Sequence, residues 1–183
     1  MSTKKKIISS LIAVLSALLV GLFVWRVVEV NLKYPAPVLK SCEKGETLNY
    51  LDTFEITVMD TEFLSDEQAQ ELFDVENTFG DVEQKYLVTT LHVKNISDEP
   101  QRFPVYELTF QSGAFFNGGM YQFLESLNGW VDVPEQQPNE ELTIKLPLNI
   151  PKTRFRDSQW ETVTQRQYEI VLRLYPEKYV LKL

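Results

Sequence analysis

The first feature of the hydrophobic pattern is an uninterrupted apolar run near the N-terminus. Residues 7–25 carry no charge and consist mainly of Leu, Ile, Val, Ala and Phe. As a helix rising about 1.5 Å per residue, such a run spans roughly 28 Å, close to the ~30 Å hydrocarbon core of a bilayer. Trp25 ends the run and Arg26 follows it, where an aromatic ring and a snorkelling cation favour the membrane interface. The pattern predicts a transmembrane helix over residues 7–26.

The charges and side chains that flank this run predict its orientation in the membrane and whether it is cleaved. Three lysines lie in residues 1–6, so the positive-inside rule places this stretch in the cytoplasm and the chain after residue 26 outside. A cleaved signal peptide is the alternative, but its apolar region is usually about 7–15 residues long and ends in small side chains. Here the run is longer and ends in Phe23-Val24-Trp25. We therefore expect an uncleaved, single-pass anchor in the cell membrane.

Beyond the anchor the continuous pattern gives way to alternation. Residues 27–52 include Tyr34-Pro35-Ala36-Pro37, which favours an extended chain, and we expect this range to be an extracytoplasmic tether. From residue 53 onward, apolar side chains recur at every second position, which is typical of half-buried strands separated by polar turns. The alternating segments are residues 54–58, 85–95, 105–110, 142–146, 168–174 and 179–183. Residues 53–183 are therefore predicted to form one antiparallel β-sandwich domain.

Two short segments have helical spacing instead. Ser65 and Gln68 have the spacing of a capping box, and apolar residues follow on one helical face, so residues 65–74 predict a short amphipathic helix. Helical spacing returns over residues 120–127. The expected fold is mostly β, with one or two short helical insertions in the sandwich and a single transmembrane helix before it.

The order of these segments resembles a known class of surface proteins. A strand that ends in a polar turn over residues 86–99 precedes a Phe-rich strand and the segment 138–144. A Tyr-Pro-x-Pro tether stands at 34–37 and a Leu-Tyr-Pro-x-Lys stretch at 174–178. This arrangement resembles the membrane-anchored, immunoglobulin-like ectodomains of Gram-positive families of unknown function. The resemblance covers most of residues 34–183, implies an immunoglobulin-like sandwich on the cell surface, and supplies no catalytic residue.

The charge of the predicted domain excludes one class of partner. After residue 26 the chain has 14 basic and 26 acidic side chains, and therefore a formal charge of −12. Nucleic-acid affinity comes mainly from Lys and Arg that neutralise phosphates. We therefore expect no nucleic-acid binding, a membrane contact through residues 7–26, and a protein partner in the envelope.

The sequence offers few residues for catalysis or metal binding. His92 is the single histidine and Cys42 the single cysteine, so Ser–His–Asp or Cys–His chemistry would depend on these two residues. Together they cannot complete the usual ligand set of zinc. We expect no catalytic residue, no metal, no cofactor and no enzymatic activity. Two alternatives stay open: an envelope hydrolase with an unrecognised pair of carboxylates, and a ligand-sensing surface protein.

Two groups of side chains are candidates for a binding surface. An aromatic group near several glycines would form a patch if it were exposed, with core packing as the alternative; it comprises Phe115, Phe116, Tyr121 and Phe123. An acidic group on the helix at 65–74 would form a docking face, with a solvated helix surface as the alternative; it comprises Asp66, Glu67, Glu71 and Asp74. The sequence thus predicts an anchored accessory module that acts by protein–protein contact at the bacterial cell envelope.

Overall fold

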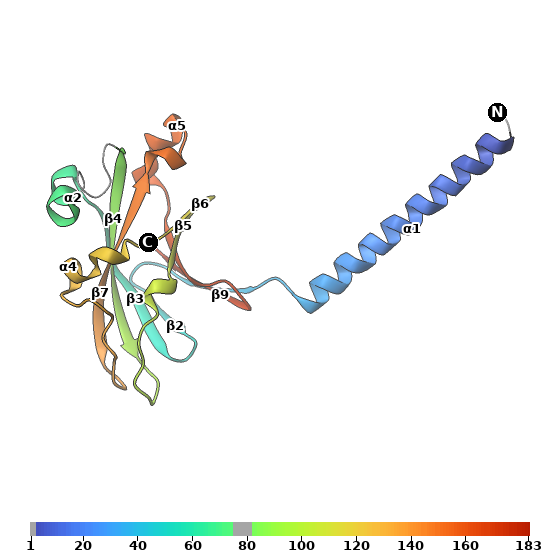
Figure 1. Cartoon of the computed structure of the whole chain (residues 1–183). Coiled ribbons are helices and arrows are strands. Elements are labelled where there is room, and N and C mark those ends of the chain that lie inside the picture. Colours follow the sequence, from blue (N-terminus) through green and yellow to red (C-terminus); the bar gives the residue numbers. More distant parts are fainter. Residues whose placement is uncertain (1–2, 75–81) are drawn as a thin grey trace. The chain divides into compact units, whose positions relative to one another are not determined.

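The computed structural model describes residues 3–74 and 82–183 (Figure 1). The chain divides into a helical unit that ends at Pro37 and a β unit that extends from Val38 to Leu183. The helices and strands, in chain order, are α1 (Thr3–Lys33), β1 (Val38–Cys42), β2 (Thr47–Tyr50), β3 (Phe54–Phe63), α2 (Asp66–Phe73), β4 (Gln84–Asn95), β5 (Thr109–Ser112), β6 (Phe115–Gly118), α4 (Leu124–Asn128), β7 (Glu141–Pro151), α5 (Asp157–Trp160), β8 (Glu169–Arg173) and β9 (Glu177–Lys182). Single 3-10 turns lie between them at η1 (Val105–Glu107), η2 (Tyr121–Phe123), η3 (Lys152–Arg154) and η4 (Val163–Gln165).

The predicted N-terminal helix is present and extends beyond the apolar run. Among the described residues, one helical segment is long and apolar enough to cross a membrane, and it covers Ile7–Lys33. The helix continues past residue 26 because apolar residues still follow and the first proline comes only at Pro35. Residues 27–33, at the start of the range 27–52 that was expected to be a tether, are therefore helical.

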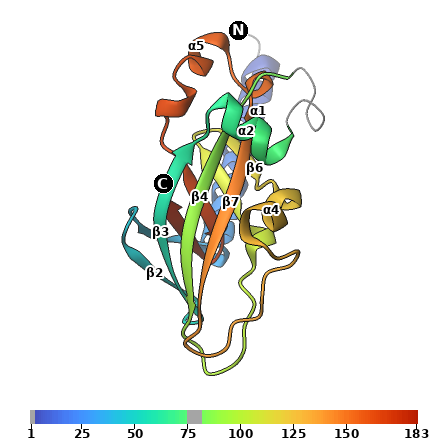
Figure 2. The same cartoon turned by 90° about the vertical axis from the view of Figure 1, so that its left-hand side faces the viewer.

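Two sheets pack face to face in the β unit, which confirms the predicted β-sandwich. One sheet has the strand order β1-β9-β8-β5-β6, and the other has the order β2-β3-β4-β7 (Figures 1 and 2). Neighbouring strands are antiparallel, except that β1 pairs in parallel with β9. Alternate side chains of both sheets meet between the layers, and the fully buried ones include Ile56, Leu91, Ile144, Phe110, Ile170 and Leu181.

The sandwich begins earlier in the chain than the sequence predicts. β1 and β2 both lie in the range 27–52 that was expected to be a tether, and the compact unit starts at Val38. Cys42, Leu48 and Tyr50 from these strands are buried in the main core. The alternation was hard to recognise because β1 exposes all four residues before Cys42, the apolar Val38 and Leu39 included, and β2 is only four residues long. Burial of three side chains nevertheless holds both strands on the domain.

Strand β4 is buried on both faces over much of its length. Leu91 and Val93 point into the main core, as the alternation predicts. On the opposite face, Tyr86 and Val88 form a second apolar cluster with Phe73 of α2 and residues near α4. Figure 2 shows α2 and α4 in front of the sheet that contains β4 and β7. α2 begins with the predicted capping box, in which the side chains of the N-cap serine and the N3 glutamine bond each other's backbone amides.

Residues 120–128, the α4 segment, also cover the outer edge of β7. The backbone N–H of Met120 donates to the Pro147 carbonyl at 2.7 Å. Asn128 accepts from the N–H of Lys145 at 2.7 Å and donates to the carbonyl of the same residue at 3.0 Å. These contacts satisfy backbone groups that an edge strand would otherwise leave exposed.

Candidate functional site

Strand β6 ends its sheet without such a cover. In the part of the chain that the structure describes, β6 pairs with β5 on one side only. A two-residue loop joins the strands, and its flanking residues Ser112 and Phe115 are paired. Because hydrogen-bonded and non-hydrogen-bonded pairs alternate in an antiparallel ladder, the N–H and C=O of the next residue, Phe116, are directed away from β5. β6 therefore presents free backbone groups at the sheet edge.

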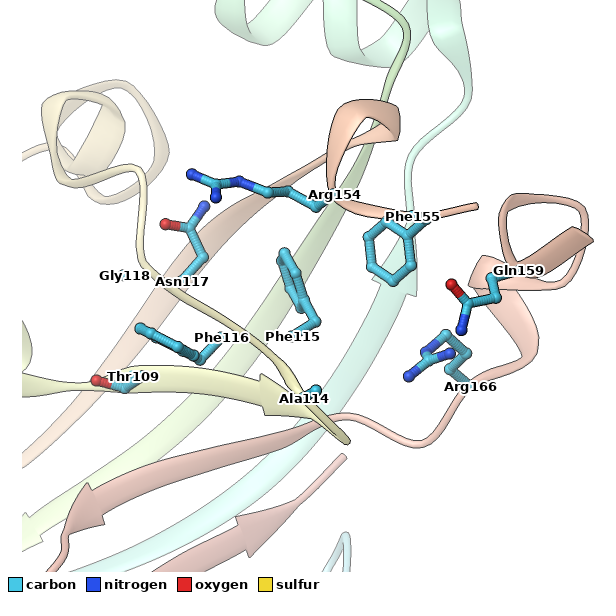
Figure 3. A pocket seen from close by; sticks show the side chains of 10 residues that line it. All are labelled: Thr109, Ala114, Phe115, Phe116, Asn117, Gly118, Arg154, Phe155, Gln159 and Arg166. Carbon is cyan, nitrogen blue, oxygen red and sulfur yellow. The ribbon is translucent and has the colours of Figure 1, made fainter. Parts of the chain in front are cut away.

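A groove of about 670 Å³ runs along this strand (Figure 3). We call it the β6 groove. One wall is the β5–β6 hairpin, and the other is the irregular segment between β7 and β8. Its lining residues are Thr109, Ala114, Phe115, Phe116, Asn117, Gly118, Arg154, Phe155, Gln159 and Arg166.

Aromatic packing holds the second wall of the groove in place. The ring of Phe155 lies 5.1 Å from that of Phe115 and 6.1 Å from that of Trp160. The indole Nε1 of Trp160 donates to Glu83 Oε1 at 2.7 Å, and Lys152 Nζ donates to the other carboxylate oxygen at 2.7 Å. These hydrogen bonds hold the pKa of Glu83 below its usual value. The segment contains only the short helical elements η3, α5 and η4, yet the rings of Phe155 and Trp160 and the carboxylate of Glu83 anchor it.

Arg166 is held in a defined position at one end of the groove. Its Nε donates to Ser112 Oγ at 3.2 Å, and its Nη2 donates to the Ser112 carbonyl at 3.1 Å. The guanidinium also lies over the Phe155 ring, 5.5 Å from the centroid. A guanidinium has five N–H groups, so donors remain available for a ligand.

Arg154 lines the groove at its other end, beside Asn117 (Figure 3). Its neighbour Lys152 is paired with Glu83, whereas among residues 3–74 and 82–183 neither Arg154 nor Arg166 pairs with a carboxylate. None of the lining residues is acidic. The groove is therefore a local basic site in a domain with a formal charge of −12.

A second hollow of about 720 Å³ adjoins the groove. It shares Thr109 and Phe116 with the groove, so the Phe116 side chain borders both hollows. Phe116 is 74% exposed, and Leu174, which lines the second hollow, is 66% exposed. Glu107 is the single carboxylate among the described residues that line either hollow.

Comparison with known proteins identifies the domain that carries this groove. Residues 40–179 match the model of a domain of unknown function, DUF5028. The chain belongs to this family. No curated protein matches the sequence.

Several solved structures similar to this chain come from Gram-positive bacteria. A candidate lipoprotein of Bacillus subtilis, ycdA, is 13% identical with a TM-score of 0.51; the match covers 78% of this chain but 38% of that chain. A conserved hypothetical protein of Bacillus anthracis is 14% identical with a TM-score of 0.46, over 69% of this chain and 86% of its own. An uncharacterised β-sandwich protein of Clostridium difficile is 13% identical with a TM-score of 0.42, over 79% of this chain and 95% of its own. At these identities the likeness concerns the fold alone.

The structure does not gather the four predicted aromatics of the DUF5028 domain into one patch. Phe115 is buried beneath the groove, and Phe123 packs against Phe73 with ring centroids 4.8 Å apart. Tyr121 donates its hydroxyl to the Leu108 carbonyl at 2.7 Å. Phe116 is the one of the four that is presented to solvent. Packing thus uses three of these rings. Phe115 and Phe116 point to opposite faces because they are successive residues of a strand, while Tyr121 and Phe123 pack from η2.

The four predicted acidic residues all belong to α2 or its C-cap and are exposed. Asp66 accepts from Lys85 Nζ at 3.4 Å, while backbone and Ser65 hydrogen bonds lower the pKa of Glu67. Asp74 adopts a left-handed conformation at the C-cap, and Glu71 lies on the solvent side. Among the residues that the structure describes, no group of three or more His, Cys, Asp or Glu side chains could hold a metal ion.

The single histidine and the single cysteine of the DUF5028 domain lie in different sheets. His92 on β4 has its Nε2 3.2 Å from Glu141 Oε2, on the exposed side of the sheet. Cys42 on β1 is 6% exposed, and burial raises the pKa of its thiol, which suppresses the reactive thiolate. The two residues therefore do not form a Cys–His pair.

The two arginines of the groove were not among the residues predicted to bind. Arg154 and Arg166 lie in a stretch without periodicity, twelve positions apart, and neither belongs to a motif. The available signal was weak: a small excess of basic residues between 152 and 166 in an otherwise acidic domain.

Proposed function

We propose that this protein is a membrane-anchored, non-enzymatic binding module of the Gram-positive cell envelope that acts by protein–protein contact. In this proposal α1 remains uncleaved, with residues 1–6 in the cytoplasm and the DUF5028 domain outside. The lysines before the apolar run support this orientation. The description of the Bacillus subtilis neighbour as a candidate lipoprotein supports a place at the membrane surface.

The observation that carries the binding role is the uncovered edge at β6. Proteins usually protect sheet edges, because free backbone groups pair readily with another chain. This domain covers the edge of β7 with the α4 segment but leaves β6 beside a groove and an exposed phenylalanine. Exposed aromatic rings next to pockets are common anchors of protein interfaces. The pattern favours a partner that adds to the β6 edge and covers Phe116.

The composition of the hollows also supports binding over hydrolysis. Glycoside hydrolysis requires two carboxylates on either side of the bond that breaks. The described lining of the two hollows contains one carboxylate, Glu107, and no histidine. The β6 groove instead supplies amides, aromatic rings and arginines, which are groups that recognise a ligand.

Site-specific photocrosslinking in intact cells tests the binding surface. A photoreactive phenylalanine analogue at position 116 of the full chain is expected to give one discrete adduct with an envelope protein. The same analogue at position 131 is the matched control, because Val131 is 73% exposed but lies outside both hollows. Equal adducts at both positions, or none at 116, would count against the proposal.

Labelling with a membrane-impermeant maleimide tests the topology. Native Cys42 is too buried to serve as the probe, so the informative chain carries Cys42→Ser together with Thr164→Cys in an exposed turn. We expect labelling in intact cells equal to that in lysed cells. Labelling only after lysis would place the domain in the cytoplasm.

A further inference from the structure

We infer that the β6 groove binds an extended peptide strand with acidic side chains, and that Arg154 and Arg166 pair with its carboxylates. The inference rests on the proposed function and names the chemistry of the partner at that site.

The free edge of β6 favours an extended peptide. Antiparallel alternation directs the N–H and C=O of Phe116 toward the open side, where a strand can complete the ladder. All four residues of β6 line the groove, and at about 3.4 Å per residue they match a peptide segment of roughly four residues. Main-chain pairing of this kind supplies affinity, while pockets beside the strand read the side chains.

The charge of the groove favours carboxylates on that peptide. Two arginines line it, no acidic residue does, and in the described part of the chain neither arginine has an ionic partner. A guanidinium offers a planar pair of donors that matches a carboxylate. Because the rest of the domain is acidic, long-range attraction cannot supply the binding of an acidic peptide. Recognition must come from the groove itself.

The position of the arginines favours acids on one face of the strand. Figure 3 shows Arg154 beside Asn117 and Arg166 beside Gln159, with the rings of Phe115 and Phe155 between them. Side chains on one face of a strand recur at every second residue. A peptide with alternating acidic and apolar residues presents its acids along one face and can reach both ends of the groove. Arg166 is already held by Ser112 and Phe155, so little side-chain freedom is lost when it binds.

The test uses the full chain in nanodiscs of uncharged lipid and three fluorescent probes. The first is a hexapeptide of alternating valine and glutamate, the second replaces glutamate by glutamine, and the third is poly(glycerol phosphate). Fluorescence anisotropy gives each Kd. We expect the glutamate peptide to bind at least about tenfold more tightly than the glutamine peptide, since charge-assisted hydrogen bonds are lost in the latter. Tighter binding of poly(glycerol phosphate) than of the glutamate peptide would overturn the inference.

Variants locate the binding within the groove. Arg154→Gln and Arg166→Gln are each expected to weaken the glutamate peptide by about tenfold or more. Arg156→Gln is the matched control, because it removes the same charge from the same segment outside the groove lining, and it should change the Kd by less than about twofold. Arg166→Lys keeps the charge but removes the planar pair of guanidinium donors, so we expect an intermediate loss of affinity. This variant provides the test if Arg166→Gln disturbs folding. Equal losses in Arg154→Gln and Arg156→Gln would show a general charge effect and overturn the inference.

N-methylation of the peptide tests the strand pairing. Methyl groups on the amides that face β6 should abolish binding, while methyl groups on the alternate amides should leave it unchanged, because only one set pairs with the edge. Equal binding of the two methylated peptides would exclude strand addition. A crosslink at position 116 without binding of the glutamate peptide would overturn the ligand class and leave the proposed function intact. Binding of the glutamate peptide without a crosslink at position 116 would support the ligand class and count against the proposed function.

Discussion

The edge strands β6 and β7, one from each sheet, lie next to each other but differ in what covers them. A hydrogen bond from Asn117 Nδ2 to the Asn149 carbonyl at 3.3 Å joins the two strands. The outer side of β7 is covered by Met120 and Asn128 of the α4 segment, whereas β6 faces a groove with two arginines. The same fold therefore protects one edge and leaves the other available. We therefore expect residues at the β7 edge to stabilise the domain and residues at the β6 edge to be available for binding.

The largest expected difference compares one apolar side chain from each edge. Leu124 of α4 is fully buried, so Leu124→Ala should lower the free energy of unfolding by about 2–5 kcal/mol through lost burial and a cavity. Phe116 on β6 is 74% exposed, so Phe116→Ala should change it by less than about 0.5 kcal/mol. Urea unfolding of the full chain in detergent, followed by far-UV circular dichroism, measures both. Similar losses in the two variants would mean that Phe116 supports the fold.

A smaller difference is expected between Asn128, which joins α4 to β7, and Asn117, which joins β6 to β7. Asn128→Ala removes the side chain that both accepts from and donates to the backbone of Lys145, and should cost about 1–3 kcal/mol. Asn117→Ala removes longer hydrogen bonds, of 3.2 and 3.3 Å to Asn149, and should cost about 0.5–1 kcal/mol. Light scattering should also rise more for Asn128→Ala, because the edge of β7 becomes free to associate. The reverse order would contradict the assignment of β7 as the protected edge.

The smallest expected effect is a pH response of the groove wall. Hydrogen bonds from Lys152 and Trp160 lower the pKa of Glu83, so the folded state favours the ionised carboxylate. The stabilisation is present above the unfolded pKa of about 4.3 and is lost as the pH falls through the lower, folded value. Trp160 fluorescence in a chain with Trp25 and Trp130 replaced by Phe should change in this acidic range. Glu83→Gln should remove the transition, and a transition of equal size in that variant would assign it to another group.

The sequence predicted the elements whose signal is local. The apolar run predicts α1, Ser65 and Gln68 predict the start of α2, and the alternation over residues 87–93 predicts β4. Each of these signals comes from residues that are close together in the sequence. The structure contains all three elements. Prediction failed over residues 105–110, where a 3-10 turn over Val105–Glu107 precedes the short strand β5 and leaves Tyr106 exposed. Apolar residues at alternate positions predicted one face of a strand, whereas the turn buries Val105 and Leu108, which are three positions apart.

By itself the sequence determined the apolar helix, the mostly β domain and its acidic charge, because periodicity and composition follow from the order of residues alone. Only the tertiary structure decided that β1 and β2 join the sandwich, that three of the four candidate aromatics pack in or against its two apolar clusters, and that Arg154 and Arg166 line a groove along β6. These outcomes depend on contacts between segments far apart in the chain. Side-chain burial and edge pairing are properties of the assembled sheets, and an irregular segment such as 152–166 takes its place from the surface on which it packs.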